Sequence, residues 1–454
     1  MVFIALVAWM GAWAQTVVDE QVSPTRYDYS QVARQITAGC DTKYEQARAI
    51  YRWLCDNISY DTSYSIFTAD ECWDSRRGVC QAYSELYYRL AEAVGLKTLI
   101  VRGEAKPADG ERESHAWVFA IVEGESTGIM IDPTWGAGSV SGSVFTRSEN
   151  DNSWFHVDPY WLIFTHFPED EAYQLLPQPV SREQFDALPA IKPFWGEYGF
   201  DAKQVLDRCM KGDGDYPTLY QSGVGVLRLA ELPEQHTLRV GESYRFAVQK
   251  LQQCEVALID NVKHGDWQLH GDTYYMEYMP TAAGDLHLGF KQDGGSRYST
   301  VAEYEVAQPS AADLARLEKA NPMLMPEVTG LANFDAAALA KYGIDGGQLL
   351  AAVRSGEVTG LPVFYATKGD CAIDAMPLNG TLHTGQSYTF TLRPRNGVKW
   401  AVINEDTWHR TWNVDAASGA MTMTVTPDKP GKLVLAVQLQ DGGTYEYCIA
   451  FTVE

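Results

Sequence analysis

The second half of the chain contains a duplicated segment, and this repeat restricts what that half can fold into. Three short motifs recur in the same order at a nearly constant distance. YGFD at 198–201 returns as YGID at 342–345 and VGESYRF at 240–246 as TGQSYTF at 384–390, both 144 residues later, and QDGG at 292–295 returns at 440–443, 148 residues later. Ordered matches at a fixed period indicate a repeated structural unit. The sequence therefore predicts two copies of one small domain.

The residue pattern within each copy favours β-structure. Each copy begins with a helix-spaced stretch, DAKQVLDRCM at 201–210 and DGGQLLAAVR at 345–354. Short alternating runs follow, such as SYTFTLRP, KWAVIN and KLVLAVQLQ, separated by Gly, Pro, Asn and Asp. This pattern is typical of β-sandwiches. We predict one sandwich at 179–308, a connector at 309–330 and a second sandwich at 331–454.

The first half of the chain mixes helical and strand periods. Apolar residues at helical spacing predict two helices, at 44–57 and at 80–94, the second ending before Gly95. The expected buried faces consist of Ala47, Ile50, Tyr51 and Leu54, and of Tyr83, Leu86, Tyr87, Leu90 and Val94. The runs KTLIVRG, HAWVFAIVEG and GIMIDPTWG then read as consecutive strands. Helices followed by strands predict an α+β domain with a largely antiparallel sheet.

The charge of the chain excludes some classes of partner. With 36 basic and 59 acidic residues, the formal net charge is −23 at pH 7. Nucleic acids and anionic membrane surfaces require a basic footprint. We therefore predict no nucleic-acid partner. The balance suits a protein outside the cytosol.

The N-terminus resembles an export signal. An apolar run in VFIALVAWMGAWAQ is followed by Ala12, Trp13 and Ala14 before Gln15, an A-x-A cleavage pattern. The run is too short to span a bilayer, and no second candidate follows. We predict a cleaved signal peptide at 1–14, an α+β domain at 15–178 and no membrane insertion after cleavage. The expected location is secreted or periplasmic, in a bacterial cell envelope.

The cysteines do not follow a metal-binding pattern. The chain has no C-x-x-C and no Cys/His cluster at zinc spacing, so a structural metal is not expected. An oxidising compartment permits disulfides, whose pairing cannot be deduced from sequence. Cys72 has several open readings: a regulatory disulfide with Cys80, a pair with Cys40 or Cys55, or simple burial.

Three separate motifs supply the parts of a thiol active site. Cys80 stands where a loop turns into a helix, and backbone N–H groups and the helix dipole there favour a thiolate. His115 begins an aromatic, β-branched strand, 35 residues later, and Asp132 ends the next strand 17 residues further on. A hairpin turning within 123–128 would place these two side by side. Together the three residues provide a nucleophile, a base and a carboxylate that orients the base.

The ordered motifs GVC-x-A-Y, HAW and DPTWGAG resemble the transglutaminase-like superfamily of papain-related cysteine enzymes. The segment IYRWLCDNISYD at 50–61 is similar to the lead-in helix and strand of that family, and 154–176 is similar to bacterial and kyphoscoliosis-peptidase-like members. The resemblance spans 40–178. It implies a papain-like core, with Cys80 as the nucleophile, His115 as general base and acid, and Asp132 as the orienting carboxylate.

The chemistry that the resemblance implies is acyl transfer from a protein or peptide carboxamide through a thioester. Release to water gives hydrolysis, which we favour because no amine-binding feature is visible. Release to a lysine amine gives cross-linking, and a scaffold protein that uses only the sandwiches is the further alternative. No acidic cluster of the kind that binds calcium in animal transglutaminases is visible, so we predict no metal and no cofactor. The pattern does not indicate an oligomeric state.

Several other residues have less specific interpretations. Trp53 and Gln46 are candidates for an oxyanion-hole donor. His156 and His166 lie in the family-like downstream segment, where a structural role is the better interpretation. Exposed aromatic residues of the sandwiches, such as Trp408 and Trp412, could bind glycans or peptides, although core packing is the more common role of such residues.

Overall fold

The computed structural model describes residues 22–107, 111–122, 128–148, 151–365, 371–394 and 399–454. The chain divides into two compact units. The first comprises Met1–His236, Arg245–Met276 and His287–Glu303, and the second comprises Thr237–Tyr244, Glu277–Leu286 and Tyr304–Glu454. The predicted signal peptide lies outside the described residues. No helix among the described residues is both long and apolar enough to cross a bilayer.

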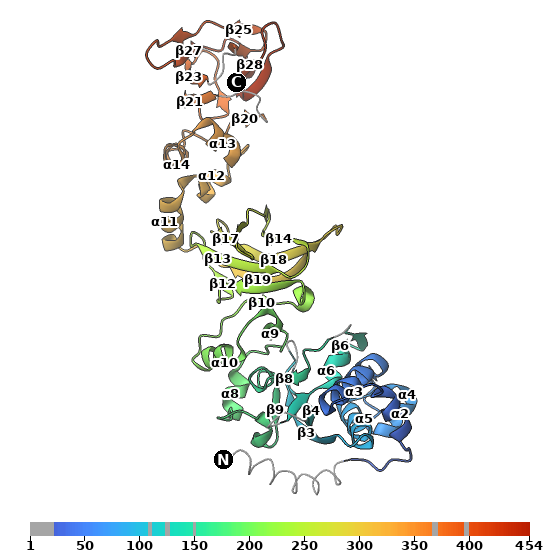
Figure 1. The fold of residues 1–454 in the computed structure, drawn as a ribbon. Coiled ribbons are helices and arrows are strands. Elements are labelled where there is room, and N and C mark those ends of the chain that lie inside the picture. Colours follow the sequence, from blue (N-terminus) through green and yellow to red (C-terminus); the bar gives the residue numbers. More distant parts are fainter. Residues whose placement is uncertain (1–21, 108–110, 123–127, 149–150, 366–370, 395–398) are drawn as a thin grey trace. The chain divides into compact units, whose positions relative to one another are not determined.

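A five-stranded sheet with the order β8-β5-β4-β3-β9 organises the N-terminal part of the chain (Figure 1). Its strands are β3 (Lys97–Ala105), β4 (Glu113–Ile121), β5 (Ile129–Ile131), β8 (Phe155–Val157) and β9 (His166–Pro168). All of its neighbouring strands pair antiparallel. The predicted α+β domain with an antiparallel sheet is therefore confirmed. The expected turn between β4 and β5 falls largely on residues that the structure does not describe.

The two predicted helices pack through the faces that the sequence indicates, except that Val94 is half-buried and follows the last residue of the second helix. They are α3 (Lys43–Asn57) and α5 (Cys80–Ala93), and α5 contacts both β3 and β4. The side chains fully removed from solvent are Ala47, Ile50, Tyr51, Leu54, Tyr83, Leu86, Tyr87 and Leu90. The Tyr87 hydroxyl also donates to the Ala47 carbonyl oxygen at 2.9 Å, which links the two helices. Burial of these side chains fixes the N-terminus of α5 in place.

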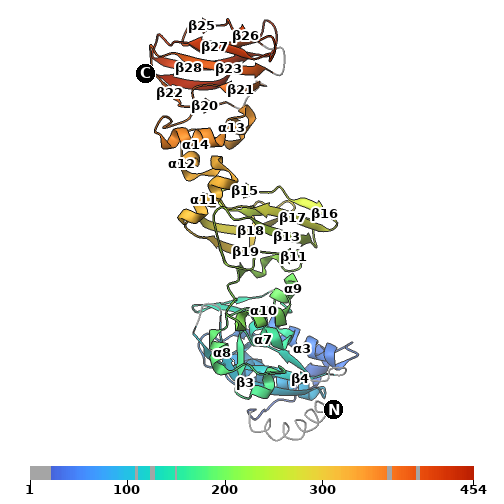
Figure 2. The same cartoon turned by 90° about the vertical axis from the view of Figure 1, so that its left-hand side faces the viewer.

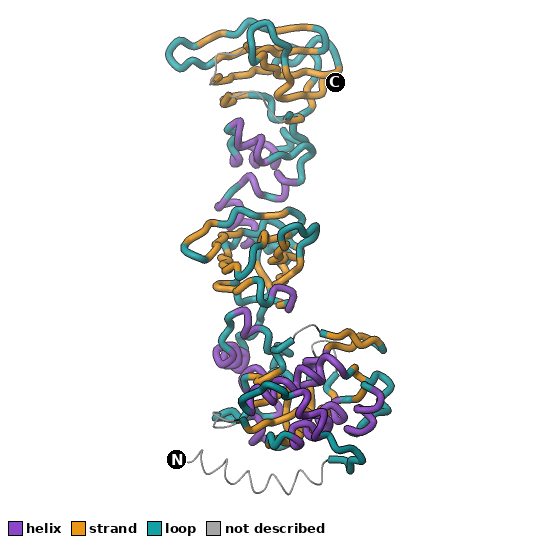
Figure 3. The backbone as a smooth tube through the Cα atoms, turned by 45° about the vertical axis from the view of Figure 1, so that its right-hand side comes forward, coloured by secondary structure: helices purple, strands orange, loops and turns teal. Residues whose placement is uncertain are grey.

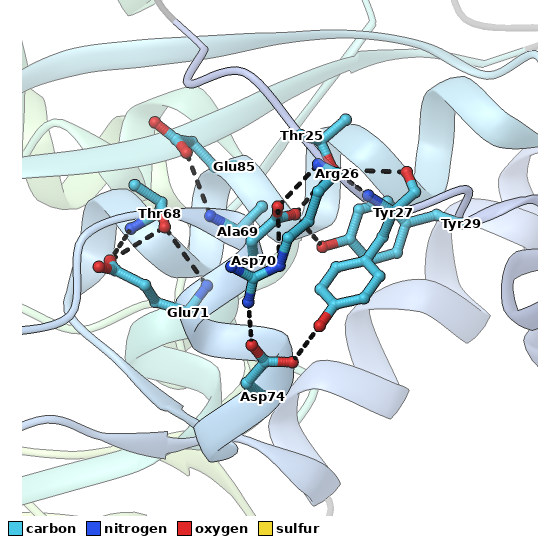
Figure 4. Close-up of polar contacts among 10 residues, drawn as sticks. All are labelled: Thr25, Arg26, Tyr27, Tyr29, Thr68, Ala69, Asp70, Glu71, Asp74 and Glu85. Atoms are coloured by element: carbon cyan, nitrogen blue, oxygen red, sulfur yellow. Dashed lines mark hydrogen bonds and ion pairs between the residues drawn. The ribbon is translucent and has the colours of Figure 1, made fainter.

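The chain upstream of α3 is anchored on α4 (Ala69–Ser75) by two carboxylates, Asp70 and Asp74, and Asp74 binds Arg26 and the Tyr27 hydroxyl (Figure 4). Asp70 accepts hydrogen bonds from the Thr25 hydroxyl at 2.7 Å, the Arg26 backbone N–H at 2.8 Å and the Tyr29 hydroxyl at 2.9 Å. These contacts hold the pKa of Asp70 below its usual range, because they outweigh the effect of its burial. The segment 25–29 thereby covers the helix that leads into the strand before Cys80.

One short helix follows the predicted domain boundary at 178 but packs on the domain before that boundary. The helix α8 (Arg182–Ala187) follows that boundary, yet Phe185 is fully buried with its ring 5.1 Å from the ring of Phe167. Lys106 on the strand side donates to the carbonyl oxygens of Phe185 and Leu188 at 2.7 and 2.6 Å. Residues 182–188 therefore pack on the α+β domain. The pattern of a short amphipathic helix does not reveal which neighbour it covers.

The first repeat forms two sheets with the orders β10-β19-β18-β14-β15 and β11-β13-β17-β16. A short strand, β12 (Thr237–Leu238), pairs parallel with β19. The other strands are β10 (Thr218–Leu219), β11 (Leu227–Glu231), β13 (Tyr244–Lys250), β14 (Cys254–Ile259), β15 (Lys263–His264), β16 (Gln268–His270), β17 (Thr273–Tyr278), β18 (Gly284–Gln292) and β19 (Ser299–Val306).

The second repeat has the same topology, with the orders β20-β29-β28-β24-β25 and β21-β23-β27-β26 and a short strand, β22 (Thr381–Leu382), parallel to β29 (Figure 2). Its other strands are β20 (Val363–Phe364), β21 (Cys371–Ala375), β23 (Tyr388–Pro394), β24 (Lys399–Asn404), β25 (Thr407–His409), β26 (Asn413–Val414), β27 (Met421–Val425), β28 (Gly431–Gln438) and β29 (Glu446–Val453). The identical strand orders confirm the duplication that the motifs predict.

Side chains from both sheets meet in the core of the second sandwich. Phe390 from β23 lies 5.9 Å from Phe451 of β29, measured between ring centroids, and Trp400 and Leu435 are buried beside them. The Trp412 ring packs against this core, and its indole N–H donates to the Trp400 carbonyl oxygen at 2.9 Å. Packing is therefore the role of Trp412, as the sequence interpretation favours.

The predicted connector is helical. It contains α11 (Ala311–Ala320) and α12 (Pro326–Thr329), and α13 (Ala336–Tyr342) and α14 (Gly346–Arg354) follow before the second sandwich. Figure 3 shows helices in this stretch, whereas the two repeats consist mostly of strand and loop. The helix-spaced stretches that open the repeats become α10 (Ala202–Met210) and α14, as predicted.

A glycine near the end of α6 (Pro133–Ala137) yields a test of packing in the α+β domain. A Cβ at Gly136 would overlap the hydroxyl of Tyr51, which is fully buried and donates to the Asp151 carbonyl oxygen at 2.8 Å. We expect Gly136→Ala to lower the free energy of unfolding by about 1–3 kcal/mol, because the buried tyrosine has to move. Urea denaturation followed by tryptophan fluorescence measures this change.

The control for that substitution is Gly265→Ala, since a Cβ at Gly265 has no atom within 4 Å. We expect its effect to stay within about 0.5 kcal/mol. Equal stability of the two variants would contradict the packing argument.

Candidate active site

Cys80 is the first residue of α5, and a short parallel strand pair leads into it. The pair consists of β1 (Ser59–Tyr60) and β2 (Arg77–Gly78), with Tyr60 opposite Gly78. Val79, the N-cap residue, has no side chain that could cap the helix. The backbone N–H groups of the first turn of α5 are therefore not occupied by a capping side chain, and a helix N-terminus of this kind favours negative charge.

The structure brings His115 and Asp132 together. The strands β4 and β5 pair antiparallel with Val118 opposite Ile131, so Asp132 continues β5 next to the strand that carries His115. His115 Nε2 lies 2.9 Å from Asp132 Oδ2, and both side chains are buried. The contact that the spacing predicts is therefore present.

Asp132 is a fully buried carboxylate with four hydrogen-bond donors. Its Oδ1 accepts from the backbone N–H groups of Thr134 at 2.8 Å and Trp135 at 3.1 Å, because Asp132 is the N-cap residue of α6. Its Oδ2 lies near His115 Nε2 and, at 3.0 Å, near His166 Nε2. Burial alone would raise the pKa of Asp132, but the charge and hydrogen bond of His115 and the hydrogen bond of His166 hold it well below its usual range.

His166 is the member of this cluster whose contact the sequence does not reveal. It begins β9, which pairs with β3 on the side opposite β4, and it is buried with its ring 5.1 Å from the ring of His115. Burial lowers the pKa of His166 to about 4, although its hydrogen bond to Asp132 opposes that shift. His166 is therefore neutral at neutral pH. The only signal in the sequence is a histidine within an otherwise apolar segment.

The tautomer of His166 follows from its two contacts. Its Nε2 faces the ionised Asp132 and must carry the single ring proton, since a carboxylate can only accept. Its Nδ1 lies 2.8 Å from the Thr165 hydroxyl oxygen and accepts from that hydroxyl. Neutral His166 thus donates one hydrogen bond to the carboxylate that also binds His115.

His115 and Cys80 form the pair that a thiol enzyme requires. Burial alone would lower the pKa of His115, but the charge and hydrogen bond of Asp132 and the hydrogen bond with Cys80 raise it to about 10. Because Nε2 binds Asp132, Nδ1 is the nitrogen left for the sulfur. Burial alone would raise the pKa of Cys80, but the hydrogen bond and charge of His115 and the Ala116 backbone N–H lower it. A thiolate–imidazolium pair is therefore favoured over the neutral pair.

Three tryptophans surround the two histidines and exclude water from them. Trp117 is stacked on His115 with 6.0 Å between ring centroids, and Trp135 lies 4.8 Å from the ring of His166. Trp154 stands at 4.8 Å from Trp135. Apolar surroundings strengthen the hydrogen bonds of the Asp132 cluster, because the local dielectric constant is low. Packing around the site is thus the role of Trp117 and Trp135.

Tyr60 is a half-buried neighbour of Cys80 that the sequence analysis does not identify. Burial, and next the negative charge of the Cys80 thiolate, raise the pKa of Tyr60 well above its usual range. Asp61 holds the following loop in place, because it accepts hydrogen bonds from Ser63 and from the Ser65 backbone N–H at 2.6 and 2.8 Å. Because its pKa is raised, the Tyr60 hydroxyl remains protonated near the Cys80 sulfur and can donate a hydrogen bond.

The two oxyanion-hole candidates from the sequence have other contacts. Trp53 is stacked on Trp73 at 5.6 Å, and the Arg76 guanidinium lies 4.0 Å from the Trp73 ring. Gln46 accepts from the Lys43 ammonium at 3.2 Å. None of these contacts involves Cys80. The first turn of α5, which begins at Cys80, and the Tyr60 hydroxyl provide other donors near the thiol.

The other cysteines near the site are thiols in the structure. Cys72 is buried beneath Gly78, and burial raises its pKa to about 12. Cys55 is buried as well, 3.7 Å from the Pro133 carbonyl oxygen. Simple burial is thus the reading of Cys72 that the structure favours. Raised pKa values make both thiols poor nucleophiles at neutral pH.

The cluster of His115, Asp132 and His166 is also the one group of potential metal ligands found among the described residues. Its ligand atoms lie within 4.8 Å of one another. However, both imidazole Nε2 atoms lie at ordinary hydrogen-bond distance from the same oxygen, Asp132 Oδ2. Hydrogen bonds account for this geometry without an ion. The absence of a cofactor stays a prediction.

Comparison with known proteins finds similarity in the N-terminal part of the chain. Residues 30–159 match the family model described as the transglutaminase-like superfamily. The kyphoscoliosis peptidase of Homo sapiens is 30% identical over 161 residues, which cover 32% of this chain and 24% of that protein. Lim and transglutaminase domain protein ltd-1 of Caenorhabditis elegans is 26% identical over 203 residues, 37% of this chain and 26% of that protein. The chain spans about a quarter of the length of these curated relatives.

A solved structure of a candidate cysteine protease from Cytophaga hutchinsonii is 22% identical to the matched part. The match covers 26% of this chain and 42% of the solved chain, with a TM-score of 0.23.

The electrostatics of the site predict how Cys80 reacts with an alkylating agent. We expect iodoacetamide to modify Cys80 readily at pH 7, where an ordinary thiol is only a few per cent ionised. His115→Phe removes the imidazole that lowers the thiol pKa, so burial alone remains and raises that pKa. The rate at pH 7 should then fall at least about tenfold and recover only above about pH 9. Peptide mapping by mass spectrometry measures the rate at each cysteine.

Cys40 is the internal reference for that experiment. It is half-buried like Cys80, but burial and the carboxylates of Glu45 and Asp41 raise its pKa. Its rate should be low at pH 7 and insensitive to His115→Phe. Equal rates at Cys40 and Cys80 in the wild-type protein would show that residue 80 has no activated thiolate.

Proposed function

We propose that the transglutaminase-like domain at residues 30–159 makes this chain a cysteine-dependent acyl-transfer enzyme that acts on protein or peptide amides. Cys80 is the nucleophile, His115 the general base and acid, and Asp132 the orienting carboxylate. The observation that carries the proposal is the continuous set of contacts from the Cys80 thiol through His115 to the buried Asp132. Hydrolysis is the favoured outcome, and transfer to a lysine amine is the alternative.

The first half of the proposed reaction forms a thioester. The Cys80 thiolate attacks the carbonyl carbon of the amide, and the carbonyl oxygen gains negative charge. The Cys80 backbone N–H at the start of α5 and the protonated Tyr60 hydroxyl are placed to stabilise that charge. The C–N bond then breaks, and the proton on His115 Nδ1 passes to the departing nitrogen. An amine or ammonia leaves, and an acyl group remains on the sulfur.

The second half releases the acyl group. Neutral His115 takes a proton from a water molecule through Nδ1, and the oxygen attacks the thioester carbon. The C–S bond breaks, the carboxylic acid product leaves, and the thiolate–imidazolium pair is restored. A lysine amine in place of water would give an isopeptide bond by the same steps.

His166 is proposed to support this cycle as a positioning residue. Its Nε2–H donates to the oxygen of Asp132 that also binds His115, so it disperses the charge of that carboxylate. The attraction of Asp132 for the His115 proton is thereby reduced. This helps the acid step, in which His115 has to release that proton to the leaving nitrogen.

An assay with a glutamine-containing protein and a fluorescent amine distinguishes the two outcomes. We expect released ammonia or new N-termini in the wild-type protein without incorporation of the amine. Cys80→Ala should abolish the reaction, and Asp132→Asn should lower kcat by at least about a hundredfold, because it binds His115 in the wrong tautomer. Predominant incorporation of the amine would support cross-linking instead.

The role of His166 is tested by the pH profile of the same reaction. We expect His166→Phe, which keeps the volume but removes the donor, to raise the pKa of His115 above about 10. The alkaline limb of kcat/KM should then move to higher pH, and kcat should fall about tenfold. His166→Gln restores an N–H donor and should recover part of the loss.

Alkylation of Cys80 separates this effect from misfolding. The rate of modification at pH 7 should stay within about twofold in His166→Phe, because the thiolate–imidazolium pair persists. His156→Gln is the control, since His156 is exposed and contacts the Tyr44 hydroxyl at 3.4 Å. An unchanged pH profile in His166→Phe would contradict the positioning role.

A further inference from the structure

The outer face of one sheet of the second sandwich carries a cluster of aromatic side chains. We call this cluster the aromatic face, and it consists of Tyr365, Trp408, Tyr445 and Tyr447. The sheet is β20-β29-β28-β24-β25, whose opposite face forms the sandwich core. Trp408 is 43% exposed and Tyr447 is 46% exposed. These exposed fractions are high for large aromatic residues, which are usually buried.

The strand register places these rings on one surface. Trp408 on β25 lies opposite Ile403 on β24, and Tyr447 on β29 lies opposite Ala436 on β28. Directly paired residues point to the same side of a sheet. The side chains beneath the rings are small or branched, and they form a separate buried cluster that Tyr365 and Tyr445 cover: Ala401, Ile403, Val434, Ala436 and Ala450. This part of the outer sheet surface is therefore apolar, and the aromatic rings lie on it.

The aromatic face has two similar halves, each with two rings and one cation. In one half, Trp408 and Tyr445 lie 5.2 Å apart, and the Arg410 guanidinium stands 4.3 Å from the Trp408 ring. In the other half, Tyr365 and Tyr447 lie 6.1 Å apart. There the Lys432 ammonium stands 5.5 Å from the Tyr447 ring and 3.3 Å from the Tyr365 hydroxyl.

The two cations have no carboxylate partner within the described part of the chain. Other lysines of the same sandwich do: Lys399 pairs with Asp441, and Lys429 pairs with Asp406. In a chain with a net charge of −23, two cations that rest on aromatic rings without a counter-ion are unusual. They point to an anionic group that the protein itself does not supply.

The first sandwich provides an internal comparison, because the cations on the same sheet face have a carboxylate partner there. Lys263 lies opposite Ile259 on β14, as Trp408 lies opposite Ile403, with 144 residues between the isoleucines. Lys263 and Lys291 both bind Glu255, at 2.8 and 2.7 Å. The first repeat thus neutralises its two lysines with Glu255 beside a single ring, Tyr298, whereas the second repeat has four rings and two cations without a carboxylate partner among the described residues. The common fold alone does not require the aromatic face.

We propose that the aromatic face binds an acidic polysaccharide, a glycan chain that carries carboxylates. The faces of aromatic rings are electronegative and attract the C–H groups that a sugar ring presents on its flat side. Arg410 and Lys432 then bind carboxylates of the chain, the arginine in bidentate geometry. The two halves accommodate two separated sugar units. The second sandwich would thereby hold the chain on a carbohydrate matrix, whatever the activity of the α+β domain.

Two other classes of anionic polymer fit the observations less well. Duplex DNA carries one charge per 1.7 Å of axis and requires a dense basic surface, which two cations do not provide. An acidic peptide would use the cations, but it has no need of four exposed ring faces. A sugar unit that carries a carboxylate uses both features, because its ring stacks on an aromatic side chain and its carboxylate binds a cation.

Affinity electrophoresis of the full chain tests the proposal. Native gels would contain polygalacturonate, a neutral β-glucan or poly-glutamate. We expect retardation by polygalacturonate that weakens with added salt, since the cations are exposed to screening. Trp408→Ala and Tyr447→Ala should each raise the dissociation constant about tenfold, and Arg410→Gln combined with Lys432→Gln should raise it at least as much. Thermal unfolding confirms that the variants fold.

Matched substitutions in the first sandwich serve as controls. Tyr220→Ala removes a ring that is 40% exposed, and Lys263→Gln removes the cation at the position equivalent to Trp408. Both should bind polygalacturonate within about twofold of the wild-type protein. No retardation of the wild-type protein, equal retardation by the neutral glucan or by poly-glutamate, or variants that bind like the wild-type protein would each overturn the proposal.

Discussion

The buried carboxylate of Asp132 is the interaction on which the N-terminal site depends. A carboxylate with no exposure would normally become neutral, because burial disfavours charge. Four N–H donors from α6, β4 and β9 prevent this. The donors come from three different elements, so the end of β5, the start of α6 and the position of β9 are all fixed by one group. Its retained charge in turn keeps a proton on His115 and makes the Cys80 thiol acidic.

The position of Cys80 depends on a different kind of constraint. Its place is set by α5, whose buried tyrosines and leucines contact the sheet and α3. The uncapped first turn of that helix favours negative charge in the same region in which His115 supplies positive charge. Local packing therefore decides where the thiol stands, and the long-range contact with β4 decides its protonation. Neither alone would produce a reactive cysteine, which is why helix N-termini with a cysteine are common without activity.

The sequence predicts those parts of this arrangement that are local or follow a hairpin. The faces of α3 and α5 repeat at helical spacing, and His115 and Asp132 lie on neighbouring antiparallel strands, so both were predictable. The contact of His166 with Asp132 was not, because β9 joins the sheet beyond β3 and the spacing along the chain does not encode that edge. Tyr60 approaches Cys80 through a two-residue parallel pair that has no periodic signal. For the same reason, the sequence did not show that Phe185 packs on Phe167.

The repeated sandwiches show which features of a sequence a fold constrains. Both copies keep the same strand order and a fully buried apolar residue at the matching position of one strand, Leu258 on β14 and Val402 on β24. Their outward positions differ, with Lys263 and its partner Glu255 in one copy and Trp408 in the other. Inward side chains have to fill the core of the sandwich. A side chain on the outer face of a sheet has only to remain compatible with water or with a ligand. A duplicated domain can therefore change its outer face without loss of the fold, and a cluster of rings with unpaired cations on this face of the second copy is better explained by binding than by stability.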